Sequence, residues 1–197
     1  MRTLAAVLVL LLTGCAGVPE ARLARPLEAG APVALAPGEA VVFGSILFVE
    51  NGKPKYPYGL GKPMWFIEGV HGKWPQFGTD KDGSFYLALP AGRYELRSAV
   101  PFYYTPYICI PYRFEAPQAG KAYYIGALRI EFESTVLLGG LWGNYIDSVD
   151  YVEVLDRFEA ASAALAARGP GAAALPLEKA LMTRIPGRRP ALGTQCR

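Results

Sequence analysis

Few side chains in this sequence are of the types that do acid–base or nucleophilic chemistry, and they follow no recognised arrangement. The chain has one histidine, His71, which is followed directly by Gly72. Histidine acts as a general base when a serine or cysteine nucleophile lies beside it. No G-x-S-x-G sequence, which would present such a serine on a sharp turn, is present. We therefore interpret His71 as a loop residue rather than a catalytic base, and we predict no catalytic residues.

Two aspartates and a glycine in Asp80-Lys81-Asp82-Gly83 invite comparison with calcium-binding loops. In an EF-hand loop, side-chain oxygens at the first and last positions hold the ion, and a glycine lies at position 6. Aligning Gly83 with that glycine places Gly78 and Leu89 at the two ligand positions, and neither has a side-chain oxygen. We interpret residues 80–83 as a tight turn. Zinc-type cysteine and histidine spacing is also missing, so we predict no metal and no cofactor.

The three cysteines are one near the N-terminus, Cys15, and two in the body of the chain, Cys109 and Cys196. In an oxidising compartment Cys109 and Cys196 can pair, which would tie the C-terminal end of the chain to the core. The alternative is that Cys109 is a buried free thiol in an apolar run and that Cys196 lies in a loose tail. The sequence leaves both alternatives open.

The first fifteen residues combine a short apolar run with a cysteine. A positive residue near the start is followed by an apolar run over residues 4–12, which suits a signal peptide and is too short to span a bilayer. Leu12-Thr13-Gly14-Cys15 matches the lipobox pattern, so this segment resembles the signal of a bacterial lipoprotein. The resemblance implies cleavage after Gly14 and acylation of Cys15, so that burial of the acyl chains anchors the protein in a membrane.

The residue after the cysteine is Ala16 rather than the aspartate that marks lipoproteins retained in the inner membrane. We therefore expect a lipid-anchored protein of the bacterial outer membrane, with its body facing the periplasm or the cell surface. The alternative is an ordinary secretory signal followed by a chance cysteine.

The charge of the chain is close to neutral. It has 20 basic and 17 acidic side chains, a formal net charge of +3, which does not favour a nucleic-acid partner. Basic residues gather near the C-terminus, at Arg184, Arg188, Arg189 and Arg197. They can contact anionic polymers of the envelope, but we favour a solvated tail.

Changes in composition divide the chain into five parts. Residues 1–14 are the signal peptide, and residues 15–38 form a Pro/Ala-rich tether, because frequent proline disfavours helix and sheet. Residues 39–155 form a domain rich in β-branched and aromatic residues. Residues 156–182 are predicted to be a helical appendage and residues 183–197 a basic, poorly ordered tail.

Seven segments of the central domain combine β-forming residues with bounding glycine, proline or asparagine, which is typical of strands. They are residues 40–49, 64–68, 84–89, 93–100, 107–114, 122–132 and 149–155. Short strands separated by turns predict an antiparallel β-sandwich or small barrel. Beyond them, Asp156 is predicted to cap an α-helix that stops at Gly169-Pro170, and residues 177–182 are a second, short helix candidate.

Two turns in the domain have a recognisable pattern. In residues 79–85, TDKDGSF, an acidic-Gly turn precedes a strand with phenylalanine, and in residues 89–96, LPAGRYEL, a Leu-Pro-x-Gly-x-Tyr turn enters the next strand. Both turns resemble those of carboxypeptidase regulatory-like domains, and the resemblance implies a seven-stranded antiparallel transthyretin-like, or prealbumin-like, β-sandwich. It implies little about function, because such domains serve as scaffolds, adhesins and peptidase accessories. Enzymes of this fold, the hydroxyisourate hydrolases, have a histidine-and-arginine cluster and a C-terminal tetrapeptide that this chain lacks.

Aromatic side chains are frequent between residues 51 and 78. The four that we select as candidate ligand contacts are Tyr56, Tyr58, Trp65 and Trp74. Flat aromatic faces on loops stack on sugar rings or meet partner proteins. The alternative is that these rings fill the core or cover its open end.

Together, these features predict a mainly-β domain followed by a C-terminal α-helix, in a non-enzymatic, membrane-anchored lipoprotein that is a scaffold or binding module. Its partners would be the membrane, through the lipid, and an envelope protein or glycan. One alternative is a carbohydrate-binding module for peptidoglycan or a surface glycan. Another is a hydrolase with an unrecognised site.

Overall fold

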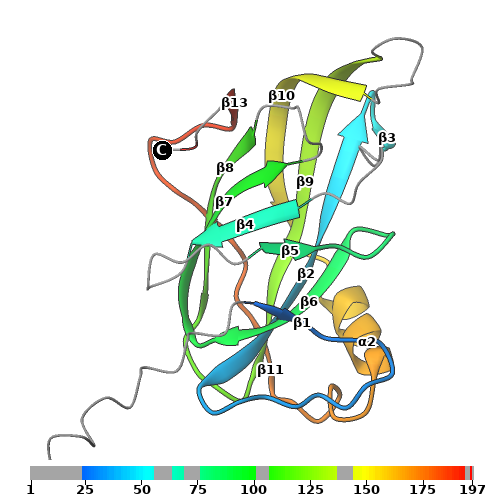
Figure 1. Cartoon of the computed structure of the whole chain (residues 1–197), viewed down its shortest axis with the longest axis vertical. Helices are drawn as coiled ribbons and strands as arrows, with labels where there is room; N and C mark the ends of the chain where they lie inside the picture. The colour runs from blue at the N-terminus through cyan, green and yellow to red at the C-terminus, as the bar shows by residue number, and fades with distance from the viewer. Residues whose placement is uncertain are drawn as a thin grey trace, which may run out of the picture.

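The computed structural model describes residues 24–55, 64–68, 76–100, 107–136, 144–193 and 196, and every structural statement below concerns these residues. This part of the chain is mainly β, with two sheets and one helix (Figure 1).

The strands belong to two sheets. Those of the first sheet are β1 (Arg25–Pro26), β2 (Glu39–Glu50), β3 (Lys53–Pro54), β6 (Ser84–Pro90), β9 (Ala122–Val136), β10 (Asn144–Leu155) and β11 (Leu177–Lys179). Their order is β1-β6-β2-β9-β10, with β3 beside β2 and β11 beside β9. Those of the second sheet are β4 (Met64–Glu68), β5 (Gln76–Gly78), β7 (Gly92–Val100), β8 (Tyr107–Ala116), β12 (Thr183–Arg184) and β13 (Ala191–Gly193). Their order is β12-β8-β7-β4-β5, with β13 beside β8.

All seven segments expected to be strands are strands, but the expectation of purely antiparallel pairing is wrong for the first sheet. β2 runs parallel to β9, from Val41 opposite Ala122 to Val49 opposite Glu131. The alternation of apolar and polar residues indicates which face of a strand is buried. Because this alternation is the same whether a strand runs parallel or antiparallel to its neighbour, it does not predict the direction of pairing. Strands that follow one another directly, such as β7 and β8 or β9 and β10, are antiparallel.

β2 and β9 approach closely where each strand has a glycine. A Cβ on Gly44 would collide with the backbone oxygen of Gly126. Gly126 has φ +106°, a conformation that only glycine adopts without strain. The register of the two strands shifts here, which is typical of a β-bulge. As a result, Ile125 before the bulge and Leu128 after it both belong to the main core.

The main core lies between the two sheets. Val42 and Ile130 of the first sheet belong to the same buried cluster as Leu96 and Ile110 of the second. A second, smaller buried cluster lies on the opposite face of the first sheet and includes Phe43 of β2. The first sheet is therefore buried on both faces over part of its length.

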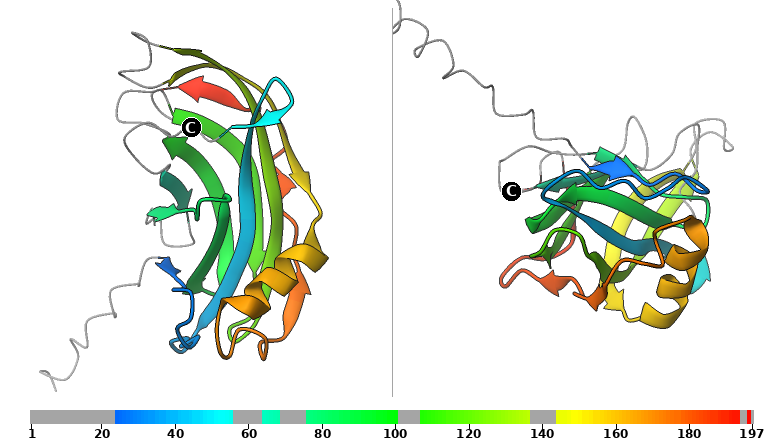
Figure 2. Two further views of the ribbon diagram at one scale, coloured as in Figure 1. Left: turned by 90° about the vertical axis from the view of Figure 1, so that its right-hand side faces the viewer. Right: turned by 90° about the horizontal axis from the view of Figure 1, so that it is seen from below.

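Helix α2 (Phe158–Arg168) covers the second cluster and lies against β2 and β9 (Figure 2). Leu165 of the helix belongs to this cluster and is 1% exposed. The prediction that Asp156 caps the helix is wrong: the N-cap residue is Arg157, and no side chain makes the capping hydrogen bond. Asp156, one residue earlier, accepts a hydrogen bond from the backbone N–H of Phe158 at 3.1 Å. The helix ends immediately before Gly169-Pro170, as predicted.

The chain after α2 differs from the prediction. Leu177–Lys179 is strand β11 rather than helix, and it pairs with the part of β9 that β10 does not reach. Met182 is not helical either: its backbone N–H donates to the oxygen of Ile125 at 2.9 Å, and its side chain is 5% exposed. Residues 183–193, expected to be poorly ordered, add β12 and β13 to the edge of β8. We name residues 177–193 the C-terminal strap. Unpaired sheet edges offer backbone hydrogen bonds that outweigh the weak helix propensity of so short a segment.

The N-terminal segment also differs from the prediction of a tether over residues 15–38. Residues 24–38 lie on the domain, with β1 paired to β6. Ala24 is 9% and Leu27 5% exposed. Burial of these apolar side chains favours docking over an extended, solvated conformation.

Candidate functional site

Most residues selected from the sequence lie outside the described part of the chain: Gly14, Cys15, Tyr56, Tyr58, His71 and Trp74. Trp65 lies in β4, where its register partners are Phe77 of β5 and Ala99 of β7. Acylation of Cys15 and ligand binding by the aromatic residues therefore stay predictions.

Cys109 and Cys196 form a disulfide, with their Cα atoms 5.2 Å apart. Cys109 lies in β8, where its register partner is Ala191 of β13. The bond joins residues 87 positions apart and holds the end of the C-terminal strap on the second sheet. The sequence left open whether Cys109 pairs with Cys196 or is a free thiol, and in the structure the two cysteines are paired.

Residues 80–83 form a turn, as predicted. Asp82 Oδ1 accepts hydrogen bonds from the backbone N–H of Ser84 at 2.9 Å and from its Oγ at 2.6 Å. Burial acts to raise the pKa of Asp82, but these hydrogen bonds outweigh burial and hold the pKa below its usual value. Asp80 pairs with Arg168 of α2 at 2.6 Å. Both aspartates are thus bound by neighbours within the protein.

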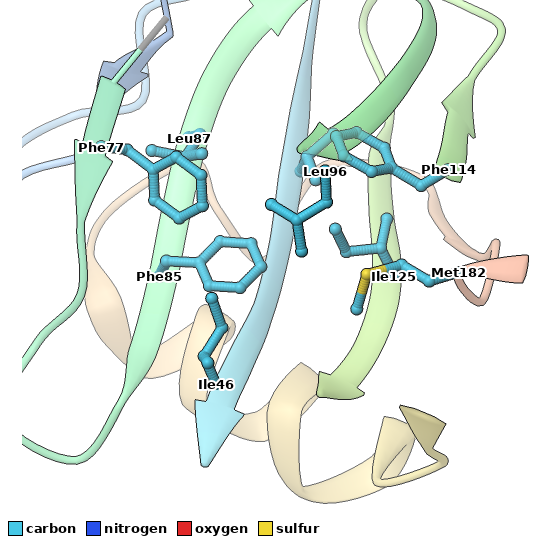
Figure 3. A pocket seen from close by; sticks show the side chains of 9 residues that line it. Ile46, Phe77, Phe85, Leu87, Leu96, Phe114, Ile125 and Met182 are labelled. Carbon is cyan, nitrogen blue, oxygen red and sulfur yellow. The ribbon is translucent and has the colours of Figure 1, made fainter. Parts of the chain in front are cut away.

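A small cavity lies between the sheets (Figure 3). Its nine lining side chains are all apolar, and they include Phe77, Phe85, Leu96, Ile125 and Met182. Its free volume is about 10 Å³, close to the smallest space that holds one water molecule. An apolar cavity of this size stays dry and is too small for an organic ligand. We interpret it as a packing gap in the core rather than a binding site.

Where β2 turns into β3, the side chains of Glu50 and Lys55 meet that of Ser134, which is distant in sequence, and we name these three residues the Glu50 corner. The Glu50 carboxylate pairs with Lys55 and accepts hydrogen bonds from the backbone N–H (3.1 Å) and Oγ (2.6 Å) of Ser134 in β9. Lys55 Nζ also donates to Ser134 Oγ at 3.3 Å. Hydrogen bonds from Lys55 and from Ser134 hold the pKa of Glu50 below its usual value.

Serine beside lysine can be a nucleophile and its base, but the Glu50 corner lacks the required proton acceptor. The ammonium of Lys55 is bound to the Glu50 carboxylate. The Ser134 hydroxyl donates to that same carboxylate, which is a weak base because its pKa is lowered. We interpret the corner as a clamp between the β2–β3 turn and β9. Glu50 and Ser134 are 84 residues apart and form no motif, so the sequence did not predict this clamp.

A second charged group lies on β9 and β10. Arg129 pairs with Glu131 on its own strand at 3.1 Å and with Glu153 of β10 at 2.9 Å. Tyr151, 51% exposed, donates to Glu153 at 3.3 Å. Partly exposed pairs of this kind contribute little to stability, because water and salt screen the attraction between the two charges. This group therefore makes an accessible polar surface rather than a source of stability.

Two of the arginines near the C-terminus are engaged within the protein. Arg188 pairs with Glu95 of β7 at 3.0 Å, and Arg184 donates to the backbone oxygen of Arg188 at 3.4 Å. Arg189 is exposed, and Arg197 lies outside the described residues. The strap that contains them is paired with β8, unlike the solvated tail that we predicted.

Within the described ranges, no group of three or more histidine, cysteine, aspartate or glutamate side chains is arranged to hold a metal ion. In the same part of the chain, no helix has the length and apolar character needed to cross a bilayer. No protein-family model, no curated protein and no solved structure matches this chain.

Proposed function

We propose that this protein is a non-enzymatic lipoprotein of the bacterial outer membrane, whose mainly-β domain binds or scaffolds another component of the cell envelope. In this proposal the chain is cleaved after Gly14, and Cys15 carries the lipid. The motif Leu12-Thr13-Gly14-Cys15 is the observation that carries the proposal. The domain would be a transthyretin-like β-sandwich held beside the membrane.

The disulfide between Cys109 and Cys196 supports an exported protein. Structural disulfides form and persist in oxidising compartments such as the periplasm, whereas cytosolic thiols are kept reduced. With these two cysteines paired, Cys15 is the remaining cysteine of the chain and stands at the position of the motif where acylation would occur. The disulfide is an argument that does not depend on the N-terminal residues.

Two features of the described residues support a sandwich. Inward-facing side chains of both sheets share one buried cluster. Tyr94, near the start of β7, donates from its hydroxyl to the backbone oxygen of Pro90, four residues earlier. This bond resembles the tyrosine corner, which fixes the chain where a strand of a β-sandwich begins. Burial raises the pKa of Tyr94 to about 12, so the hydroxyl keeps its proton at physiological pH.

The state of the described polar groups supports binding rather than catalysis. The Glu50 corner and the turn at residues 80–83 are held by neighbouring side chains. The charges around Arg129 also pair with one another, but they are partly exposed and lie next to the exposed ring of Tyr151. Exposed aromatic and charged groups on a rigid sheet are suited to contact with a partner.

Metabolic labelling tests the anchor. The full-length chain, expressed in a Gram-negative host with radiolabelled palmitate, is expected to incorporate label and to sediment with outer membranes. The matched control is Cys15→Ala, which is expected to lose the label and the sedimentation. A native chain without label would contradict the proposed anchor.

Crosslinking in intact cells tests the binding role. The native protein should crosslink to the same envelope component in repeated experiments. An unrelated soluble domain of similar size, fused to residues 1–23 as a control, should not. Identical crosslinks from both proteins would mean that the lipid alone determines the neighbours.

Glycan binding through Tyr56, Tyr58, Trp65 and Trp74 stays a prediction, because no described contact favours it. Retention on purified sacculi tests it. A Trp65→Ala, Trp74→Ala double variant that is retained as well as the native chain would contradict it.

A further inference from the structure

Residues 24–38, which we name the docked segment, contact the domain at three places. At the first, β1 pairs with β6, and the backbone N–H of Leu27 donates to the oxygen of Tyr86 at 2.9 Å. The Leu27 side chain is 5% exposed and belongs to the cluster beneath α2. The segment therefore continues the first sheet and contributes to its packing.

The second place is the C-terminal end of α2. The backbone N–H of Gly30 donates to the oxygen of Arg168 at 2.6 Å, and that of Val33 donates to the oxygen of Pro170 at 3.2 Å. The Arg168 side chain donates in return to the oxygen of Leu27 at 2.9 Å. Carbonyls at a helix end lack partners within the helix, so the docked segment supplies donors that α2 needs.

The third place is Glu39, which is 4% exposed. Its carboxylate accepts a hydrogen bond from the backbone N–H of Ala36 at 2.8 Å and pairs with Arg25 at 3.1 Å. Arg25 also donates to the oxygen of Ala34 at 2.6 Å. A buried carboxylate is costly without such partners, so release of the segment would leave Glu39 unsatisfied.

We infer that the docked segment shortens the tether and confines the domain, together with whatever it binds, to the layer next to the membrane. The inference rests on the proposed lipid at Cys15. Nine peptide units separate Cys15 from Ala24, and in any conformation they span at most about 32 Å. A tether that ran to Glu39 would contain 24 units and could span about 86 Å. Docking therefore removes more than half of the reach.

The strand order then limits where a partner lies. One row of register partners crosses the first sheet from Arg25 through Ala88, Val41 and Ala122 to Leu177 at the far edge. Four strand spacings correspond to about 19 Å. Ten peptide units from Cys15 to Arg25 span at most about 36 Å, so Leu177, which is 38% exposed, lies within roughly 55 Å of the anchored residue. A partner that contacts this row must therefore reach to within roughly 55 Å of the membrane.

Hydrogen exchange read by mass spectrometry tests the docking without any lipid. In the mature chain, residues 15–197, peptides that contain the backbone N–H groups of Leu27, Gly30 and Val33 should exchange at least tenfold more slowly than a free peptide of residues 15–38. Leu27→Asp should abolish this protection. Ala29→Asp, which places the same charge at an exposed position in the same segment, should keep it.

The same experiment reports whether each variant is folded, through the exchange of β9. Should Leu27→Asp fail to fold, Arg25→Ala replaces it, because it removes two contacts of the segment without placing a charge in the core. Exchange of the native segment at the rate of the free peptide would overturn the inference. That result would leave palmitate labelling of Cys15 unchanged, so failure of the docking and failure of the anchor are distinguishable.

Neutron reflectometry tests the reach. Because Cys109 and Cys196 are bonded, the Cys15 thiol of the mature chain can be coupled selectively to a maleimide lipid in a supported bilayer. The native and Ala29→Asp proteins should form protein layers of the same thickness on the bilayer. Eight glycine and serine residues inserted before Ala24 should move its outer limit outward by up to about 29 Å, and Leu27→Asp should also move it outward. A native layer as extended as that of Leu27→Asp would overturn the inference.

Discussion

Removing the disulfide between Cys109 and Cys196 is expected to destabilise the folded protein more than the loss of any surface ion pair. The bond joins residues 87 positions apart. In the chain-entropy treatment, a closed loop of this length lowers the entropy of the unfolded chain by about 15 cal/mol/K, or about 4.6 kcal/mol at 25 °C. The Cys109→Ala, Cys196→Ala double variant should therefore lose stability up to that amount.

The observed loss of stability also depends on how far the strap frays in the folded state without the disulfide. β13 pairs with β8 over only three residues, Ala191–Gly193, and without the bond it can fray. Fraying returns entropy to the folded state and reduces the loss. Closer to α2 the strap is held by β12 and by the buried side chain of Met182. We therefore expect fraying to stop there and the loss to lie between about 2 and about 5 kcal/mol.

Urea unfolding followed by circular dichroism measures this loss. If the free energy of unfolding falls by about 2 kcal/mol per molar urea, the urea concentration at the unfolding midpoint should fall by about 1 to 2.5 M. Both proteins carry Cys15→Ser, so that they differ only in the bond, and reductant added to the disulfide-bonded protein should reproduce the double variant. Coincident midpoints would refute the entropy argument. A changed slope would show instead that the strap detaches before the domain unfolds.

Three further substitutions test the packing and the pKa shifts by urea unfolding. Met182→Ala should cost about 2 to 4 kcal/mol, because it removes a buried wall of the cavity, whereas Thr183→Ala at the exposed neighbouring position should cost less than about 0.5 kcal/mol. Glu50→Gln should be less stable than the native protein at pH 7. Because the folded-state pKa of Glu50 lies below 4.5, this difference is complete above pH 4.5 and should disappear as the pH falls through the folded-state value. Tyr94→Phe should cost about 1 kcal/mol. Since the pKa of Tyr94 is raised from 10.0 to about 12, the cost should be full below pH 10 and should be lost between pH 10 and pH 12, where the unfolded chain ionises before the folded protein does.

Each of the three predictions for Met182, Glu50 and Tyr94 would be contradicted by a specific result. Equal midpoints for Met182→Ala and Thr183→Ala would mean that the strap does not contribute to the core. A constant difference between Glu50→Gln and the native protein from pH 7 to pH 2 would contradict the lowered pKa. Ultraviolet titration that shows Tyr94 ionising near pH 10, by difference from Tyr94→Phe, would contradict its burial.

Local sequence patterns predicted the elements that are stabilised by their own residues. Residues 64–68 form a strand with the predicted limits, and α2 stops at the predicted Gly169-Pro170. Alternation and stop signals act over a few residues, so they can be read without the rest of the molecule. The turn at residues 80–83 was predictable for the same reason, because glycine and aspartate favour it locally.

The candidate site was predictable only in part. Cys15 is identified by a contiguous motif and needs no fold. The Glu50 corner and the pairs around Arg129 join residues that no spacing relates. For the two remaining cysteines, the sequence indicated two alternatives, and pairing depended on whether the strap returns to β8.

The amino-acid sequence by itself determined the signal-like N-terminus, the mainly-β character and the positions of the principal strands and the helix. Only the tertiary structure decided the parallel pairing of β2 with β9, the docking of residues 24–38, the strands of the C-terminal strap and the disulfide at its end. The physical reason is the distance along the sequence over which each interaction acts. Side-chain periodicity and turn preference are properties of neighbouring residues, whereas a sheet edge such as that of β8 or a carboxylate such as Glu50 binds partners from distant parts of the chain.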